Sequence, residues 1–147
     1  MTRAELLTFM RRHRVVVQTS VSKDGAPQAA AVGVAVGDDC EVVFDTLQTT
    51  RKAQNLRQHP KIAFVFGGWG SGEEQTVQYE GVADEPRGAE LDRVRGLYFA
   101  VWPDGRARLA WSGLNHVRVR PTWLCHSNHR SPERMLEFSA GELTALR

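Results

Sequence analysis

The sequence predicts a mainly β protein with a few helices, an α+β fold in which six or so antiparallel strands form a small barrel. Runs rich in β-branched residues are separated by short turns that contain Gly, Asp and Pro, the pattern of strands and hairpins. The helical stretches do not alternate with strands as they do in a parallel, doubly wound sheet. A length of 147 residues suits one domain over residues 1–147.

The first third of the chain predicts a helix followed by a three-stranded meander. Thr2 and Glu5 fit a capping box for a helix that ends near Arg12. The turn SKDGAP and the turn GDD then separate runs that favour strands. These strands are expected at residues 15–21, 28–36 and 40–46.

The rest of the chain mixes helices and strands. Residues 51–59 predict a helix of about two turns that Pro60 ends. Pro121 predicts a bulge or an edge position inside the last long strand. The tail from Arg134 fits neither periodicity clearly. Further strands are expected at 61–68, 76–85 and 116–127, and a further helix at 88–102.

Composition excludes several classes of protein. A net charge of +2 with intermixed acids and bases argues against a nucleic-acid or membrane-surface binder. The longest apolar run, residues 29–36, is too short to span a bilayer, and the first fifteen residues show no secretory signal. We therefore expect a cytoplasmic protein in which Cys40 and Cys125 are free thiols.

Several apparent motifs carry little chemistry. The glycine-rich segment 67–72 lacks the Gly-Lys-Ser/Thr ending of a phosphate-binding loop. Cys125, His126 and His129 lack the spacing of a zinc site, so no metal site is predicted. No serine lies in a Gly-x-Ser-x-Gly motif. No catalytic acid or base can be named from the sequence.

The segment Thr49-Thr50-Arg51-Lys52 indicates a candidate anion-binding site. Two cations open a predicted helix, where the positive end of the helix dipole favours acidic side chains instead. A phosphate bound there would accept hydrogen bonds from the free N–H groups, the Thr hydroxyls and both cations. The alternative is that both cations simply extend into solvent.

The stretch EVVFDTLQTTRKAQNLRQHPKIAFVF, residues 41–66, resembles the flavin-phosphate segment of the pyridoxamine 5′-phosphate oxidase-like, FMN-binding split-barrel superfamily. In both, a strand ends in an aromatic residue and Thr. A short loop, Ser/Thr-Arg-Lys, a helix with Asn-Leu, a Pro and another strand follow. The resemblance covers most of the chain and implies an FMN-binding split β-barrel.

The resemblance also implies the positions of the cofactor-binding residues. The phosphate would be held at the strand end and helix start, the backbone of one strand would lie along the isoalloxazine ring, and a Gln at the start of a long strand would reach the cofactor. These residues are Ala30, Ala31, Val32, Gly33, Asp45, Thr46, Thr50, Arg51, Lys52 and Gln75.

The C-terminal segment departs from the family. True pyridoxamine 5′-phosphate oxidases continue from Glu-Phe-Trp into an Arg-x-His-x-Arg motif that binds substrate, whereas Glu137-Phe138 precede Ser139 here. The expectation is therefore an FMN-dependent oxidoreductase that acts on another small molecule and oxidises pyridoxamine 5′-phosphate inefficiently.

Two alternatives for the cofactor stay open, and a partner is expected. The fold also accommodates the deazaflavin F420, which would make an F420-dependent reductase. A protein that binds flavin or haem without turnover is the other alternative, with His126 or His129 as haem ligands. Because a small barrel only partly covers a flavin, we expect a homodimer with cofactor sites at its interface. Four tryptophans are available for that contact: Trp69, Trp102, Trp111 and Trp123.

Overall fold

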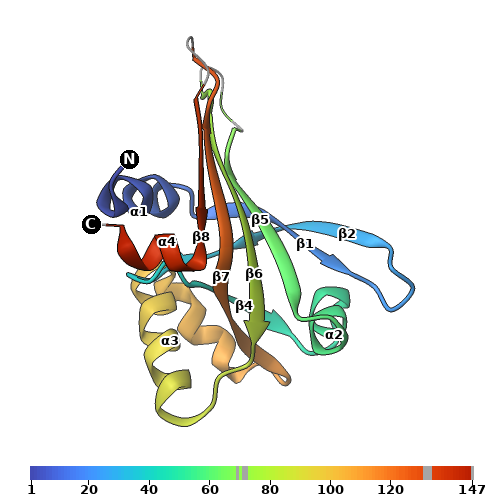
Figure 1. The fold of residues 1–147 in the computed structure, drawn as a ribbon. Helices are drawn as coiled ribbons and strands as arrows, with labels where there is room; N and C mark the ends of the chain where they lie inside the picture. Colours follow the sequence, from blue (N-terminus) through green and yellow to red (C-terminus); the bar gives the residue numbers. More distant parts are fainter. Residues whose placement is uncertain (69, 71–72, 131–133, 147) are drawn as a thin grey trace.

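The computed structural model describes residues 1–68, 70, 73–130 and 134–146 (Figure 1). The elements in chain order are α1 (Arg3–Arg12), β1 (Val15–Val21), β2 (Pro27–Gly33), β3 (Ala35–Val36), β4 (Val42–Leu47), α2 (Arg51–Gln58), β5 (Lys61–Gly67), β6 (Gln75–Asp84), α3 (Gly88–Val101), the 3₁₀ helix η1 (Pro103–Ala110), β7 (Leu114–Asn128), β8 (Arg134–Ser139) and α4 (Ala140–Ala145). Among the described helices, none combines the length and apolar character that crossing a bilayer requires.

Within the described residues, eight strands form one antiparallel sheet: seven follow the order β2-β1-β5-β6-β7-β4-β3, and β8 pairs with β7 beside this path. The two ends of this order, β2 and β3, follow each other in the chain. They adjoin at Val34, whose N–H donates to the Arg14 carbonyl. The sheet therefore curls into a barrel, and the predicted antiparallel α+β split barrel is confirmed.

The long strand β7 divides this barrel. Residues 114–119 pair with β4, while residues 123–128 pair with β8. The bulge predicted at Pro121 lies between the two halves: Gly81 pairs with Pro121 and Glu80 with Trp123, so Thr122 has no partner on β6. On the other side β4 pairs up to Val119 and β8 from Trp123, so the proline lies between these two pairings of β7.

One predicted strand, residues 28–36, is two strands in the structure. The chain leaves β1 after Gly33 and pairs with β4 from Ala35. This break is where the barrel closes. The helices predicted near the N-terminus, after Thr50 and after Pro86 are confirmed within one or two residues, and the tail forms β8 and α4.

The barrel interior is filled by aromatic side chains. Phe44, Phe64, Phe66 and Tyr79 come from three strands and are at most 1% exposed. The Tyr79 hydroxyl donates to two backbone carbonyls, those of Cys40 and Val119, and burial raises its pKa. A second apolar cluster packs α3 onto β3 and β4, and is formed by Ala35, Val43, Val94, Tyr98 and Phe99.

The position opposite Pro121 requires glycine. A Cβ on Gly81 would lie 2.5 Å from the Arg120 carbonyl oxygen and 2.5 Å from Val119 Cγ1. We expect Gly81→Ala to lower the free energy of unfolding by about 2 kcal/mol, the usual cost of overpacking. The control is Gly96→Ala on the open face of α3, where a Cβ meets nothing within 4 Å. The free energy of unfolding of this control, measured in urea, should rise by roughly 0.5–1 kcal/mol. Equal effects of the two substitutions would contradict the requirement for glycine at residue 81.

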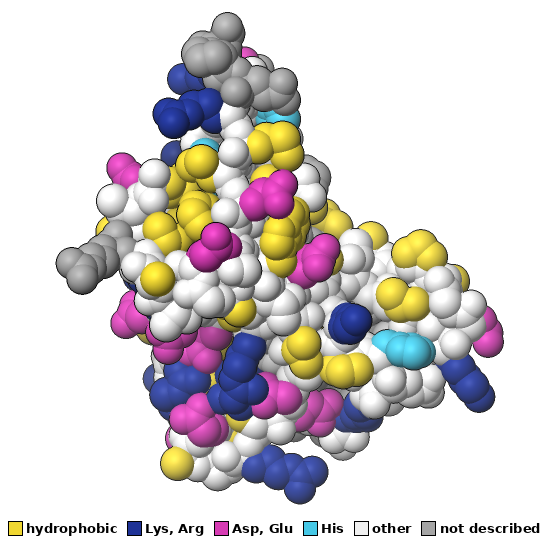
Figure 2. Space-filling view, viewed as in Figure 1, with side chains coloured by type: hydrophobic (Ala, Val, Ile, Leu, Met, Phe, Trp, Pro, Cys, Tyr) yellow, Lys and Arg dark blue, Asp and Glu magenta, His cyan; other side chains and the backbone are white. Residues whose placement is uncertain are grey.

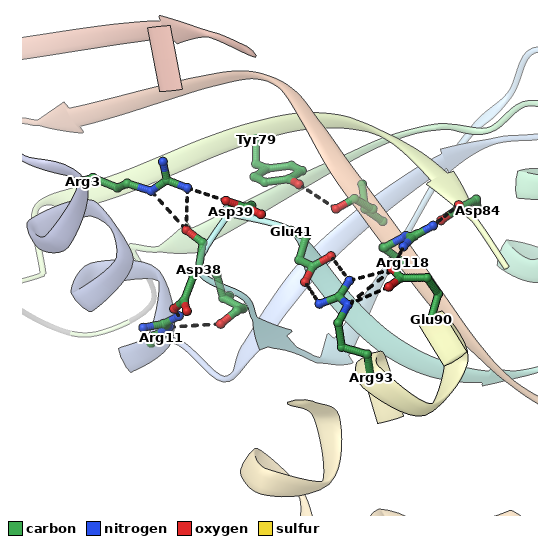
Figure 3. A network of polar contacts seen from close by, with 12 residues as sticks. Arg3, Arg11, Asp38, Asp39, Glu41, Tyr79, Asp84, Glu90, Arg93 and Arg118 are labelled. Carbon is green, nitrogen blue, oxygen red and sulfur yellow. Dashed lines mark hydrogen bonds and ion pairs between the residues drawn. The ribbon is translucent and has the colours of Figure 1, made fainter. Parts of the chain in front are cut away.

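Charged side chains form a continuous network on the side of α3 (Figure 3). Arg118 on β7 is 7% exposed and donates to both carboxylate oxygens of Asp84, at 2.9 and 2.6 Å, and to Glu90 at 2.6 Å. Arg93 joins Glu90 to Glu41 near the start of β4. Acidic and basic groups are likewise intermixed on the surface over α3 (Figure 2).

Candidate functional site

The two threonines at the head of α2 contact each other. Thr46 is the penultimate residue of β4, is 6% exposed, and its hydroxyl lies 2.8 Å from the Thr50 hydroxyl. Thr50 is the N-cap of α2, and its side chain accepts from the N–H of Ala53. The end of the strand and the start of the helix are thereby fixed to each other.

Two cations follow this threonine pair. The first turn of α2 contains no acidic residue. Arg51 is exposed and Lys52 half-buried, and neither side chain forms a hydrogen bond or ion pair with any residue that the structure describes. The first N–H groups of a helix also have no acceptor within the helix. These donors together form a site that an anion would stabilise.

Asn55 fixes the direction of α2, a role that the sequence did not reveal. Its amide nitrogen donates to the Gln28 side chain at 2.7 Å and to the Ser20 hydroxyl at 3.1 Å. The side chain is 8% exposed. A buried Asn inside an amphipathic helix is the signal that could have identified it, because buried amides need partners. The contact holds α2 against β1 and the start of β2.

The predicted cofactor-binding residues on strand β2 differ in their exposure to solvent. Ala30 and Ala31 are exposed, Val32 is buried and Gly33 is half-buried. A Cβ on Gly33 would lie 3.0 Å from Trp102 Cζ2. The indole of Trp102 also donates to the Val34 carbonyl, so a side chain at residue 33 would have to displace a ring that is held in place within this chain.

The side chain of Asp45 is engaged on the other face of β4. One carboxylate oxygen accepts from the Tyr98 hydroxyl at 3.0 Å and the other from Arg108 Nε at 2.7 Å. Burial, together with this carboxylate, raises the pKa of Tyr98 to about 12. Adjacent residues of a strand point to opposite faces, so Asp45 faces α3 and η1 while Thr46 faces α2.

Gln75 lies far from this group. Its side-chain oxygen is 3.1 Å from His126 Nε2, in a hollow of about 570 Å³ that Phe9 also lines. Gln75 pairs with Asn128 of β7, and Thr46 pairs with Asn115 of the same strand. Gln75 and Thr46 are therefore thirteen residues apart along β7, or about 40 Å of strand. Figure 1 shows the start of β6 near the top and α2 near the bottom.

The histidines and tryptophans named from the sequence are dispersed. His126 is 5% exposed and burial lowers its pKa, whereas His129 is exposed. In the described part of the chain no group of three His, Cys, Asp or Glu side chains is arranged to hold a metal ion. Trp111 is 55% exposed and Trp123 half-buried. Trp69 lies outside the described residues.

Comparison with known proteins gives a family match and several similar folds. Residues 2–120 match the family model for pyridoxamine 5′-phosphate oxidase. The chain is 37% identical over 93 residues to a pyridoxine/pyridoxamine 5′-phosphate oxidase of Thermosynechococcus vestitus, a match covering 63% of this chain and 41% of that protein. A Rubrobacter xylanophilus enzyme of the same name is 33% identical over 97 residues, with 66% and 42% covered. The chain thus spans less than half the length of these relatives.

Two solved structures show the same fold. A haem-binding protein from Mycobacterium smegmatis superposes with a TM-score of 0.84 at 18% identity, over 99% of this chain and 61% of the other. A pyridoxamine 5′-phosphate oxidase-related, FMN-binding protein from Nostoc punctiforme gives a TM-score of 0.69 at 14% identity, over 92% of this chain and 87% of the other. At such identities these matches establish the architecture.

Proposed function

This chain belongs to the pyridoxamine 5′-phosphate oxidase family, and from that premise we propose that it binds FMN and passes a hydride or an electron pair between the flavin and a small substrate. The observation that carries the proposal is the head of α2. There, Arg51 and Lys52 lie beside the Thr46–Thr50 hydroxyl pair with no acidic residue in the first helical turn. This donor set matches the chemistry of a terminal phosphate.

In this proposal each part of the site has one task. The two hydroxyls, the first N–H groups of α2 and both cations hold the phosphate, and Asn55 keeps the helix in position. The backbone of the exposed residues Ala30 and Ala31 would lie along the ring. FMN supplies the redox chemistry at its isoalloxazine ring, and the protein supplies position and electrostatics.

The proposed substrate differs from pyridoxamine 5′-phosphate. Glu137 and Phe138 lie on β8, but Ser139 then forms a capping box with Glu142 and begins α4. The hydroxyl of Ser139 is used as a helix cap where the family has an indole. The described residues assign no acid or base to the reaction, so the substrate is expected to react directly with the flavin.

We further propose that the site is completed by a second copy of the chain. About 40 Å of strand separates Gln75 from Thr46, so one chain cannot bring both to the same flavin. The outer face of the sheet carries exposed Val21 and Val82, which line a shallow hollow of about 460 Å³ together with Ala63. An isologous twofold contact on this face would cover these side chains.

The double substitution Val21→Glu/Val82→Glu tests this dimer. We expect the parent to sediment at about twice its 16.4 kDa chain mass and the variant at about one chain mass, because unpaired carboxylates disfavour burial. Both positions are more than a third exposed, so the free energy of unfolding of the monomer should change little. FMN affinity should fall with the loss of the dimer; a monomer that binds FMN as tightly as the parent would refute the shared site.

The identity of the cofactor is tested by what co-purifies. We expect the protein, expressed in a host that makes FMN, F420 and haem, to be yellow with the two visible bands of a flavin. A single violet band would indicate F420. Riboflavin is the second check, because it lacks the phosphate that the head of α2 is proposed to hold. The parent should bind FMN more tightly than riboflavin.

Haem is the second candidate, and one observation favours it. His126 lines the hollow of about 570 Å³ next to Phe9, and its Nε2 atom donates to the side-chain oxygen of the neutral Gln75, which would have to move away for Nε2 to bind iron. A neutral imidazole is a suitable haem ligand. A strong Soret band that is lost in His126→Ala and retained in His129→Ala would favour haem over FMN.

A further inference from the structure

A basic cavity lies between the last turn of α2, the first half of α3 and the start of β7. It has a volume of about 440 Å³, within the range of small-molecule sites. Arg57, Arg87 and Arg95 line it. Among the described residues around it, Glu85 carries the one carboxylate, and this carboxylate pairs with Arg57 at 3.1 Å. Two guanidinium groups are therefore left without an acidic partner in the cavity.

These two arginines are held differently. Arg87 is the exposed N-cap residue of α3 and forms no hydrogen bond or ion pair with the described residues. Arg95, two turns further along α3, donates from Nε to His116 Nδ1 at 3.4 Å. Neither cation neutralises a carboxylate of the fold, which contrasts with the paired arginines Arg93, Arg108 and Arg118 nearby.

His116 supplies an independent observation. It lines the same cavity, is 2% exposed, and its Nε2 atom has no partner among the described residues. Because Arg95 Nε is a donor, Nδ1 must accept, and the neutral ring carries its proton on Nε2. Burial, and then the Arg95 charge, lower the pKa of His116. A buried N–H donor without an acceptor costs free energy that a bound acceptor would restore.

We propose that this cavity is a second anion site, separate from the head of α2, that binds a phosphate monoester with a small organic group. Arg87 and Arg95 pair with the phosphate oxygens, and the side chains that bury His116 Nε2 move aside so that its N–H donates to the same anion. Guanidinium groups match phosphate geometry in a bidentate manner. Leu91 and Leu114, which also line the cavity, provide an apolar wall for the organic group.

The experiment separates this site from the head of α2. Phenyl phosphate is titrated by calorimetry into the full chain and into Arg51→Gln/Lys52→Gln, which lacks the cations of α2. We expect the second site to keep its affinity in both proteins, and binding at the head of α2 to be seen in the parent alone. In that second background, adding Arg87→Gln and Arg95→Gln should weaken binding at least about tenfold, the effect of losing one or two charge-assisted hydrogen bonds.

Matched controls make the outcome decisive. Arg14→Gln removes an exposed cation just before β1 and should leave the affinity within about twofold, since screened surface charges act weakly at a distance. Arg87→Gln alone breaks no described contact, so its effect reports on binding and not on folding. No binding by the parent, an unchanged affinity in the Arg87/Arg95 variant, or an equal loss in Arg14→Gln would overturn the proposal.

Two further measurements test the chemistry of the ligand. The Nε2 proton of His116 should shift in the ¹H NMR spectrum when phenyl phosphate is added; an unmoved signal at saturation would overturn the proposed contact. Inorganic phosphate should bind more weakly than phenyl phosphate, because it cannot use the apolar wall. Equal affinities would overturn the assignment of an ester. Neither result depends on whether FMN binds at α2.

Discussion

Replacing both Arg51 and Lys52 with alanine is expected to weaken FMN binding by more than about a hundredfold. Charge-assisted hydrogen bonds contribute roughly 1.5–3 kcal/mol each, and about 1.4 kcal/mol is a factor of ten in affinity. Each single substitution should therefore cost between several-fold and a few hundred-fold. Quenching of flavin fluorescence during titration measures the FMN affinity of the double variant and of each single variant.

The matched control removes two cations elsewhere. Arg14 and Lys23 are exposed and lie outside the proposed site, so Arg14→Ala/Lys23→Ala should bind FMN like the parent. Riboflavin provides the second comparison, because it lacks the phosphate. The parent should prefer FMN over riboflavin, and the Arg51/Lys52 variant should lose most of that preference. A double variant that binds FMN as tightly as the parent would refute the phosphate assignment.

Arg118→Ala is expected to lower the free energy of unfolding by about 2 kcal/mol, the contribution of hydrogen bonds to charged groups, because Asp84 and Glu90 regain water once the arginine is removed. Arg118 and Arg120 both donate to Asp84 Oδ2, but their side chains are 7% and 60% exposed. The exposed pair is screened by water and should contribute less than about 1 kcal/mol. Arg120→Ala is therefore a control on the same strand with the same partner. Chemical denaturation measures both, and equal losses would contradict the role of burial.

The pH dependence of these variants follows from Asp84. Hydrogen bonding to Arg118 lowers the pKa of Asp84 below its ordinary value. A carboxylate with a lowered pKa stabilises the fold above its unfolded pKa, and that stability is lost as the pH falls through the folded pKa. The difference between the parent and Arg118→Ala should thus be constant from pH 7 to 5 and shrink below about pH 4.

Local signals in the sequence were sufficient for the helix that carries the candidate phosphate site. Thr50 caps α2 and Pro60 follows its end, so both limits are encoded within a few residues. The resemblance in residues 41–66 then indicated the donor set, and the Thr46–Thr50 contact is consistent with it. The family and the split barrel could therefore be predicted before any coordinates.

Features that depend on distant contacts could not be predicted in this way. The break at Val34 lies inside an uninterrupted apolar run, and it exists because β2 and β3 pair with different strands. The resemblance likewise implied that Gln75 reaches the cofactor, but no local signal showed that the length of β7 separates Gln75 from Thr46 within one chain. The cavity around His116 combines residues from α2, α3 and β7, which no local pattern relates.

The divided strand β7 also constrains how the chain can fold during synthesis. β4 has only the two-residue strand β3 as a partner until residues 114–119 are available, and β6 lacks its second neighbour until the same strand emerges. Pairing over such sequence separations slows folding, and unpaired apolar strand edges promote aggregation. A nascent chain that ends before residue 114 should thus be a strong client of ribosome-associated chaperones, and release from them should coincide with the appearance of β7.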